Sequence, residues 1–201
     1  MKLYKHLYIL PLLYIFTACS TTVPAISEYR INTNLTTKEF TQHGCKDNSL
    51  KIAQAFSSSN LMTQSMRYGE GDFKQYTFRE SQWAESPNRA ITSEFLAYIK
   101  NSNLFKNVQI SKSRSKNGLL LETNIVDFMQ YFSADEKSSY SNVSIVLTLI
   151  DTKSNSVLAT QSFSSRVEAK ELSAEGGVVA LNAALKSVVI EGGEWLAGVC
   201  K

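Results

Sequence analysis

The stretch VSIVLTLID, residues 143–151, gives the clearest fold signal in this chain. Its apolar residues alternate along an extended backbone. One face carries Val143, Ile145, Leu147 and Leu149, and the other carries Val146 and Ile150. A polar turn over residues 151–156 separates this run from a second run of strand-forming residues, 157–166. The two runs predict a long antiparallel hairpin.

Two helices are predicted outside this hairpin. Ser86-Pro87 is a typical helix start, since Ser can cap free amides and Pro needs no donor at the first position. Behind it, apolar residues recur every fourth position over about four turns, at Ile91, Phe95 and Ile99. The second helix begins after Ser173, with the apolar positions Val178, Leu181, Leu185 and Val188. Gly192-Gly193 is expected to bend or stop it before Trp195, because interior Gly disfavours a helix.

The remaining strands are short apolar runs between polar turns. They are expected at residues 50–56, 62–68, 74–78 and 108–111, and at 119–128 after a hairpin turn at Asn117-Gly118. Residues 69–72, Gly-Glu-Gly-Asp, form the turn between the second and third of these strands. The pattern predicts an α+β fold, a mainly antiparallel sheet with two principal helices packed on it.

The N-terminal segment is predicted to be a signal peptide, residues 1–18. Lys2 and Lys5 precede an apolar run, residues 7–16, that is far shorter than the roughly 20 residues of a spanning helix. The segment Phe16-Thr17-Ala18-Cys19 resembles a bacterial lipobox, with Phe where Leu is usual. The resemblance implies a thioether-linked lipid and palmitate-type acyl chains on Cys19, which anchor the protein durably. The alternative is an ordinary secretory signal with an incidental cysteine.

After cleavage, residues 19–48 read as a polar, lipidated tether with a short strand near residues 29–31, and residues 49–201 as one domain. Ser20 favours sorting to the periplasmic face of the outer membrane. Without the two signal-peptide lysines the formal charge falls from +3 to +1, which gives no indication of nucleic-acid binding. Cys45 and Cys200 are a candidate disulfide in a compartment that permits one.

Catalytic and metal-binding patterns are weak in this sequence. His43 is the only histidine beyond the signal, too few for a zinc site, and His43-Gly44-Cys45 lacks a third orienting group. Asp135-Glu136 reads as a solvated pair in a polar loop. We therefore expect a protein that is not an enzyme, with no metal and no cofactor other than the covalent lipid.

Seven aromatic residues admit two interpretations, either the core of a small sheet or the lining of a groove for a lipid or peptide. They are Tyr68, Tyr76, Phe78, Trp83, Phe128, Tyr131 and Phe132. The pair Tyr131-Phe132 lies at a strand end before a polar loop. It is our candidate for a partner contact.

Several motifs of this sequence, taken in their order along the chain, resemble those of the auxiliary lipoproteins of ABC-type transporters. This family is the group of paraquat-inducible protein C, and its members accompany MCE-type lipid transport systems. The resemblance spans most of residues 50–196 and rests on Met66-Arg67-Tyr68, the Tyr76–Pro87 segment, the helix after it, Leu104–Val108, Val126-Asp127-Phe128, Leu149-Ile150-Asp151 and the final Trp195 helix.

This resemblance implies a non-catalytic docking or assembly role in intermembrane lipid trafficking. The implied partners are an MCE-domain substrate-binding protein with its permease and ATPase, and the membrane through the lipid. A homo-oligomeric ring would suit the end of an MCE tube. The alternative is an envelope lipoprotein that activates or scaffolds a cell-wall synthase complex.

Overall fold

The computed structural model describes residues 24–36, 39–40 and 44–200. Two helices, α1 (Pro87–Asn101) and α2 (Ala174–Val199), lie beside one nine-stranded sheet in this part of the chain, with a short 3-10 helix, η2 (Ser59–Met62). The strands are β1 (Ser27–Tyr29), β2 (Ser49–Ile52), β3 (Phe56–Ser57), β4 (Ser65–Glu70), β5 (Lys74–Trp83), β6 (Asn107–Ile110), β7 (Leu119–Phe132), β8 (Ser139–Asp151) and β9 (Ser156–Glu168).

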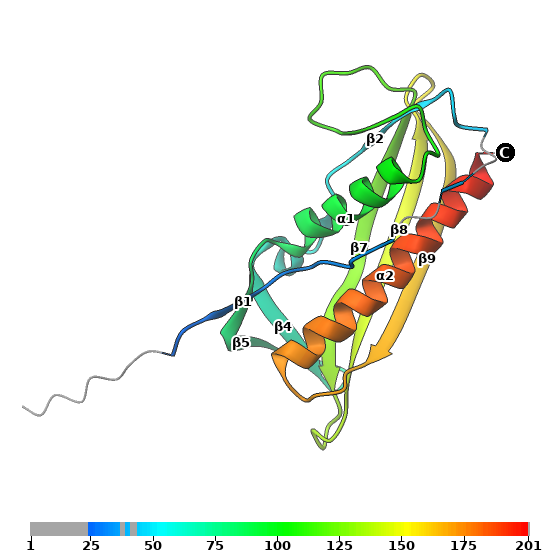
Figure 1. The fold of residues 1–201 in the computed structure, drawn as a ribbon. Helices are drawn as coiled ribbons and strands as arrows, with labels where there is room; N and C mark the ends of the chain where they lie inside the picture. The colour runs from blue at the N-terminus through cyan, green and yellow to red at the C-terminus, as the bar shows by residue number, and fades with distance from the viewer. Residues whose placement is uncertain (1–23, 37–38, 41–43, 201) are drawn as a thin grey trace, which may run out of the picture.

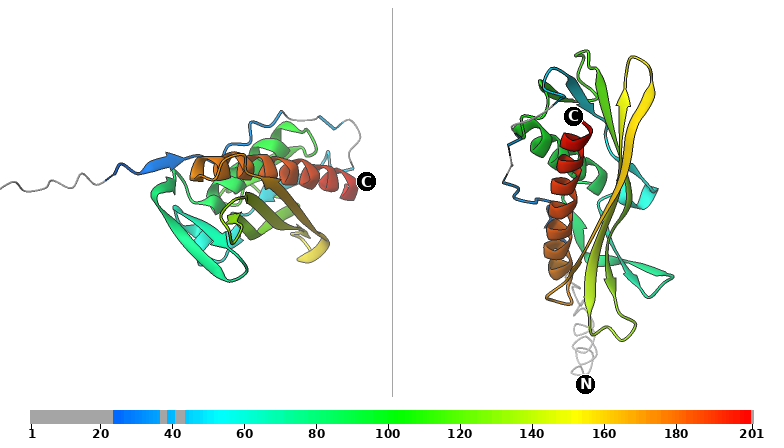
Figure 2. Two further views of the ribbon diagram at one scale, coloured as in Figure 1. Left: turned by 90° about the horizontal axis from the view of Figure 1, so that it is seen from below. Right: turned by 90° about the vertical axis from the view of Figure 1, so that its right-hand side faces the viewer.

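Both helices cover the same face of the sheet and leave the opposite face open (Figures 1 and 2). The predicted α+β domain, a mainly antiparallel sheet with two principal helices packed on it, is therefore confirmed, but the sheet is mixed rather than purely antiparallel. Among the described strands, five of the eight pairings are parallel. The long strands β7, β8 and β9 are antiparallel, as predicted, while β7 also pairs in parallel with β2, β3 and β4. Parallel partners come from distant parts of the chain, so local periodicity does not reveal them.

The predicted hairpin of β8 and β9 is confirmed and forms the centre of the core. The helix-facing side of β8 is buried through Val143, Ile145, Leu147 and Leu149, each at most 1% exposed. On the outward side of β8, every residue from Tyr140 to Ile150 is half-buried. This pattern is the one expected for a sheet with one covered face.

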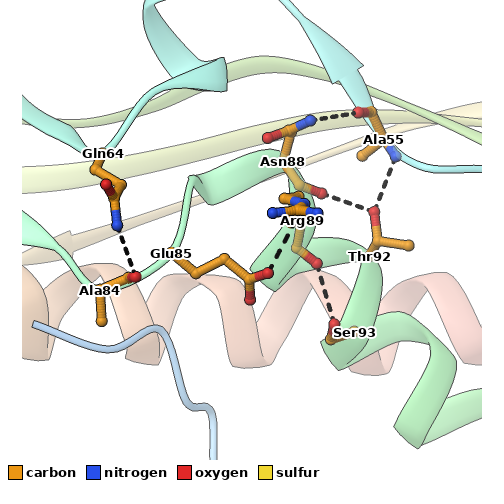
Figure 3. A network of polar contacts seen from close by, with 8 residues as sticks. All are labelled: Ala55, Gln64, Ala84, Glu85, Asn88, Arg89, Thr92 and Ser93. Atoms are coloured by element: carbon orange, nitrogen blue, oxygen red, sulfur yellow. Dashed lines mark hydrogen bonds and ion pairs between the residues drawn. The ribbon is translucent and has the colours of Figure 1, made fainter.

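Helix α1 starts at Pro87 as predicted, although the Ser86 side chain makes no capping hydrogen bond. A polar network instead holds residue 55 to the helix (Figure 3). The amide of Ala55 donates to Thr92 Oγ1 at 2.9 Å, and its carbonyl accepts from Asn88 Nδ2 at 3.2 Å. The predicted strand over residues 50–56 is consequently split into β2 and β3, because Ala55 bonds to α1 between them.

The hairpin turn predicted at Asn117-Gly118 is wrong. β6 and β7 both pair in parallel with β2, which lies between them. The hairpin turn favoured by Asn-Gly needs positive φ at both residues, and neither has it. The Gly118 amide donates to the carbonyl of Ser49 on β2 instead.

The break predicted in the last helix is also wrong, since α2 runs through Gly192-Gly193. Ser173 caps it as predicted, by accepting a hydrogen bond from the Gly176 amide at 3.1 Å. A Cβ on Gly192 would lie 2.9 Å from Leu147 Cδ1, and one on Gly193 would lie 2.3 Å from Tyr98 Cε1. The glycines thus permit close packing on β8 and α1, and this packing compensates for their low helix propensity.

Residues 24–36 differ from a slack tether. β1 pairs with β5, the Asn32 amide donates to Asn182 Oδ1 at 2.7 Å, and Thr33 is only 5% exposed. Part of the predicted 19–48 tether is therefore packed against the domain. The short strand expected at residues 29–31 lies at Ser27–Tyr29.

The structure forms the predicted disulfide between Cys45 and Cys200, with a Cα–Cα distance of 5.0 Å. Both cysteines are buried. The Cys200 carbonyl also accepts a hydrogen bond from the Gly44 amide. These links join the C-terminal end of α2 to the segment that enters β2.

Candidate functional site

Four of the seven aromatic residues form a half-exposed cluster on the helix side of the sheet, beyond the N-terminal end of α2. Tyr68 is at its centre, with ring centroids 5.3 Å from Tyr76, 4.5 Å from Phe78 and 5.4 Å from Phe132. With Leu172, Glu70 and Glu136, these rings line a pocket of about 220 Å³. The pairing of β4 with both β5 and the end of β7 brings the rings together.

Two more exposed apolar side chains belong to segments that adjoin this cluster in the chain or at the pocket. Phe73 is 95% exposed at the turn between β4 and β5, and Leu172 is 50% exposed in the segment before α2. Gly71 provides the positive φ of 59° that the turn uses. We call the set Tyr68, Phe73, Tyr76, Phe78, Phe132 and Leu172 the aromatic tip.

Two of the remaining three aromatics belong to the core. Trp83 and Phe128 are buried, with ring centroids 5.7 Å apart, and belong to the core. The expectation of core aromatics therefore describes these two residues, and the expectation of a groove describes the four rings of the aromatic tip. Sequence reasoning missed Phe73 and Leu172, although an apolar residue between Asp72 and Lys74 in a polar turn is a usable signal.

The predicted contact pair Tyr131-Phe132 is divided between the two faces of the sheet. Phe132 joins the aromatic tip, whereas Tyr131 lies on the open face, stacked on Tyr140 at 5.2 Å and beside Gly69. Consecutive strand residues point to opposite faces, so the pair cannot form one patch.

The open face carries a second group at this end, which we call the tyrosine cluster: Asp127, Tyr131, Tyr140, Asn142 and Arg166. Asp127 Oδ2 accepts hydrogen bonds from Tyr131 Oη at 2.9 Å and from Asn142 Nδ2 at 2.7 Å. The Arg166 guanidinium lies 3.5 Å from the centroid of the Tyr140 ring, a cation–π contact. A shift in the β7–β8 register between Ile125 and Asp127 places Asp127 on this face.

Burial dominates the electrostatics of this cluster. Desolvation raises the pKa of Asp127 despite the hydrogen bonds from Asn142, Tyr131 and the Phe128 backbone, which favour its charged form. Desolvation, together with the nearby Asp127 carboxylate, also raises the pKa of Tyr131. Two neighbours donate to the same oxygen of Asp127, and these bonds hold its side chain in a fixed position.

The variant Asp127→Asn is expected to become more stable relative to the native protein as pH rises from 3 to 7. A raised folded-state pKa gives stability that is present at low pH and is lost as the carboxyl ionises. Asn retains an acceptor for Tyr131 and Asn142 but has no charge. Denaturant unfolding at several pH values measures the difference.

The matched control is Asp135→Asn. The exposed Asp135 has a lowered pKa because Ser133 and the Lys137 amide donate to it. The ionised Asp135 carboxylate stabilises the folded state above the ordinary pKa of an Asp, and this contribution is lost in acid. Removing the carboxylate should therefore lower the stability more as pH rises. Equal pH trends for the two variants would contradict this account of Asp127.

Other candidate residues from the sequence lie elsewhere. Cys19 and His43 are outside the described residues. Asp135-Glu136 lies in the exposed β7–β8 turn. Within the described ranges no group of three or more His, Cys, Asp or Glu side chains is placed to hold a metal ion, and no helix there is long and apolar enough to cross a membrane.

Comparison with known proteins identifies the fold. No family model matches the sequence, and no curated protein matches it. Among solved structures, protein XCC0632 from Xanthomonas campestris, described with the family model DUF330, aligns with a TM-score of 0.76 and 11% identity over 86% of this chain and 96% of that one. An uncharacterized protein aligns with a TM-score of 0.61 and 14% identity, over 80% of this chain and 99% of that one. The hypothetical protein CT253 from Chlamydia trachomatis aligns with a TM-score of 0.49 and 9% identity, over 77% of this chain and 98% of that one. At such identities the first two matches show a shared fold.

Proposed function

We propose that this chain is a non-catalytic lipoprotein of the bacterial envelope that serves an MCE-type ABC lipid transport system. Its lipidated Cys19 would hold it at the periplasmic face of the outer membrane. The domain would dock an MCE-domain protein, which associates with a permease and an ATPase. The lipobox-like segment and the order of motifs support this role, and the fold shared with XCC0632 is compatible with it.

The observation that carries the docking role is the open face of the sheet. Neither helix covers it (Figure 2), and at one end it presents Tyr131, Tyr140 and Arg166. Tyr and Arg are among the residue types enriched at protein interfaces, since they combine apolar area with hydrogen-bonding groups. The stack and the cation–π contact hold these side chains in place, which lowers the entropy cost of binding.

The edge of β9 supports self-association as part of this proposal. β9 pairs only with β8 among the described strands, and it is 13 residues long. From Ser156 to Ser165 it has no charged residue and no proline, the usual devices that protect a free strand edge. A second copy could pair along this edge and so begin a homo-oligomer.

Photo-crosslinking in intact cells tests the proposal. A benzophenone amino acid at Tyr140 should capture an MCE-domain protein, and one at Ser162 on β9 should capture a second copy of this chain. The control position is Lys153, in the β8–β9 turn at the opposite end of the sheet, where little capture is expected. Cys19→Ser should abolish capture of the MCE protein, because the domain no longer remains at the membrane.

Two outcomes would overturn the proposal in different ways. Capture of a cell-wall synthase at Tyr140, without any transporter subunit, would make the chain an envelope activator or scaffold. Equal capture of the MCE protein at Tyr140 and Lys153 would show that the tyrosine end of the open face is not the docking surface.

A further inference from the structure

The aromatic tip contains the most exposed large apolar side chain of the described residues. Phe73 is 95% exposed, and Leu172 and Tyr76, which both line the pocket, are 50% and 40% exposed. They come from the β4–β5 turn, from β5 and from the segment before α2, and the last two of these meet at the pocket. Several exposed apolar side chains in one part of a folded domain are typical of a surface that is covered by a partner or a membrane.

The chain that leads to Cys19 leaves the domain toward this same end. β1 runs parallel to β5 with Ser27 opposite Ser81, so the chain before Ser27 is directed toward Lys74 and the β4–β5 turn. Figure 1 shows β1, β4 and β5 together in the lower part of the molecule. Eight positions separate Cys19 from Ser27 and seven separate Lys74 from Ser81, so the chain is long enough for Cys19 to reach the level of the tip.

The chemistry of the tip suits the interface of a bilayer. Phe and Leu favour the acyl boundary, while Tyr rings prefer the headgroup level. Lys74 follows Phe73 directly, and Lys residues near an apolar surface can lay their stems on it and keep the ammonium in water. The Lys74 side chain is 65% exposed, and its Nζ lies 3.3 Å from Glu70 Oε1.

The segments around the aromatic tip carry more negative than positive charge, and this affects which lipid surface the tip can approach. Residues 70–74, 135–137 and 170–175 contain six carboxylates and three lysines: Glu70, Asp72, Asp135, Glu136, Glu171 and Glu175 against Lys74, Lys137 and Lys170. An excess of negative charge is repelled by anionic lipid within a Debye length. The tip therefore fits a zwitterionic phospholipid surface and not an anionic one.

We propose that the aromatic tip is a membrane contact that seats the domain on a zwitterionic phospholipid surface next to its lipid anchor. The proposal rests on the proposed lipoprotein function for its location in the cell, but the contact itself belongs to the folded domain. It fixes the orientation of the molecule, with the aromatic tip at the bilayer and the β8–β9 turn directed away from it.

Vesicle binding of the unlipidated protein tests the contact separately from the anchor. The mature chain with Cys19→Ser is sedimented with phosphatidylcholine vesicles. Phe73→Ser combined with Leu172→Ser should weaken binding at least tenfold, since both side chains are exposed and their loss leaves the core intact. The matched control, Val157→Ser, removes a 60% exposed apolar side chain next to the β8–β9 turn and should leave binding unchanged.

Lipid charge provides a second readout. Replacing a third of the phosphatidylcholine by phosphatidylglycerol should weaken binding at low salt, and added salt should restore it. Absence of vesicle binding by the Cys19→Ser protein, or an equal loss for Val157→Ser, would overturn the membrane contact. Neither result would affect the partner capture that tests the proposed function.

Quenching by brominated lipid tests the orientation directly. A tryptophan introduced as Phe73→Trp should be quenched by vesicles that contain brominated acyl chains, with the signal of the native Trp83 and Trp195 subtracted. The same substitution as Val157→Trp should not be quenched. Quenching at residue 157 but not at residue 73 would place the opposite end at the membrane.

Discussion

Loss of the Cys45–Cys200 disulfide is expected to lower the free energy of unfolding by about 4 to 5 kcal/mol. The cysteines are 155 residues apart, so the bond closes most of the domain into one loop and restricts the unfolded chain strongly. A domain of this size has a total stability of about 5 to 15 kcal/mol, so the loss is a large fraction of it.

Urea unfolding with and without reductant, in the Cys19→Ser background, measures this effect. The double variant Cys45→Ser with Cys200→Ser should match the reduced protein and should not respond to reductant. Hydrogen exchange should also become faster in the last turns of α2, because the disulfide and the Gly44–Cys200 hydrogen bond hold that end to the segment before β2. A stability change below about 1 kcal/mol would contradict the loop-closure account.

The features that the sequence predicts correctly are those with a local physical cause. Ile91, Phe95 and Ile99 recur at helical spacing behind a Pro start, and they are the buried stripe of α1. Val143 to Leu149 alternate because the sheet has one covered face, which also gives the β8–β9 hairpin. In both cases neighbouring residues alone carry the signal.

The features that local reasoning misses depend on segments distant in the chain. The insertion of β2 between β6 and β7 joins residues that are more than 50 positions apart, and no local pattern at Asn117-Gly118 reports it. The sequence placed Tyr131 and Phe132 in one contact surface, but strand geometry directs them to opposite faces. Phe73 is detectable in the sequence only as an apolar residue in a polar turn. Its meaning depends on Leu172 and on the direction of β1, both of which require the fold.

The two glycines in α2 are the clearest case of a tertiary cause that overrides local propensity. Taken alone, Gly192-Gly193 indicates a helix break. In the structure, Gly192 lies against Leu147 and Phe95, and Gly193 lies against the ring of Tyr98. The absence of two side chains is therefore what brings α2 close to β8 and α1.

Gly193→Ala is accordingly expected to destabilise the protein by about 2 to 3 kcal/mol. The new Cβ would lie 2.3 Å from Tyr98 Cε1, and Tyr98 is only 2% exposed, so its ring has little room to move. The overpacking cost outweighs the gain of up to about 1 kcal/mol that alanine brings to a helix interior. Denaturant unfolding of the variant measures the sum of the two effects.

Gly198→Ala is the matched control in the same helix. A Cβ at this position meets no heavy atom within 4 Å beyond its chain neighbours and the backbone of its own helix, so only the difference in helix propensity remains. The variant should gain up to about 1 kcal/mol. The same chemical change thus has opposite signs at two positions five residues apart. Combining Gly193→Ala with Tyr98→Ala should cost less than the two changes added together, because removal of the ring relieves the clash. Equal shifts for Gly193→Ala and Gly198→Ala, or strict additivity with Tyr98→Ala, would mean that α2 does not pack against α1 through this glycine.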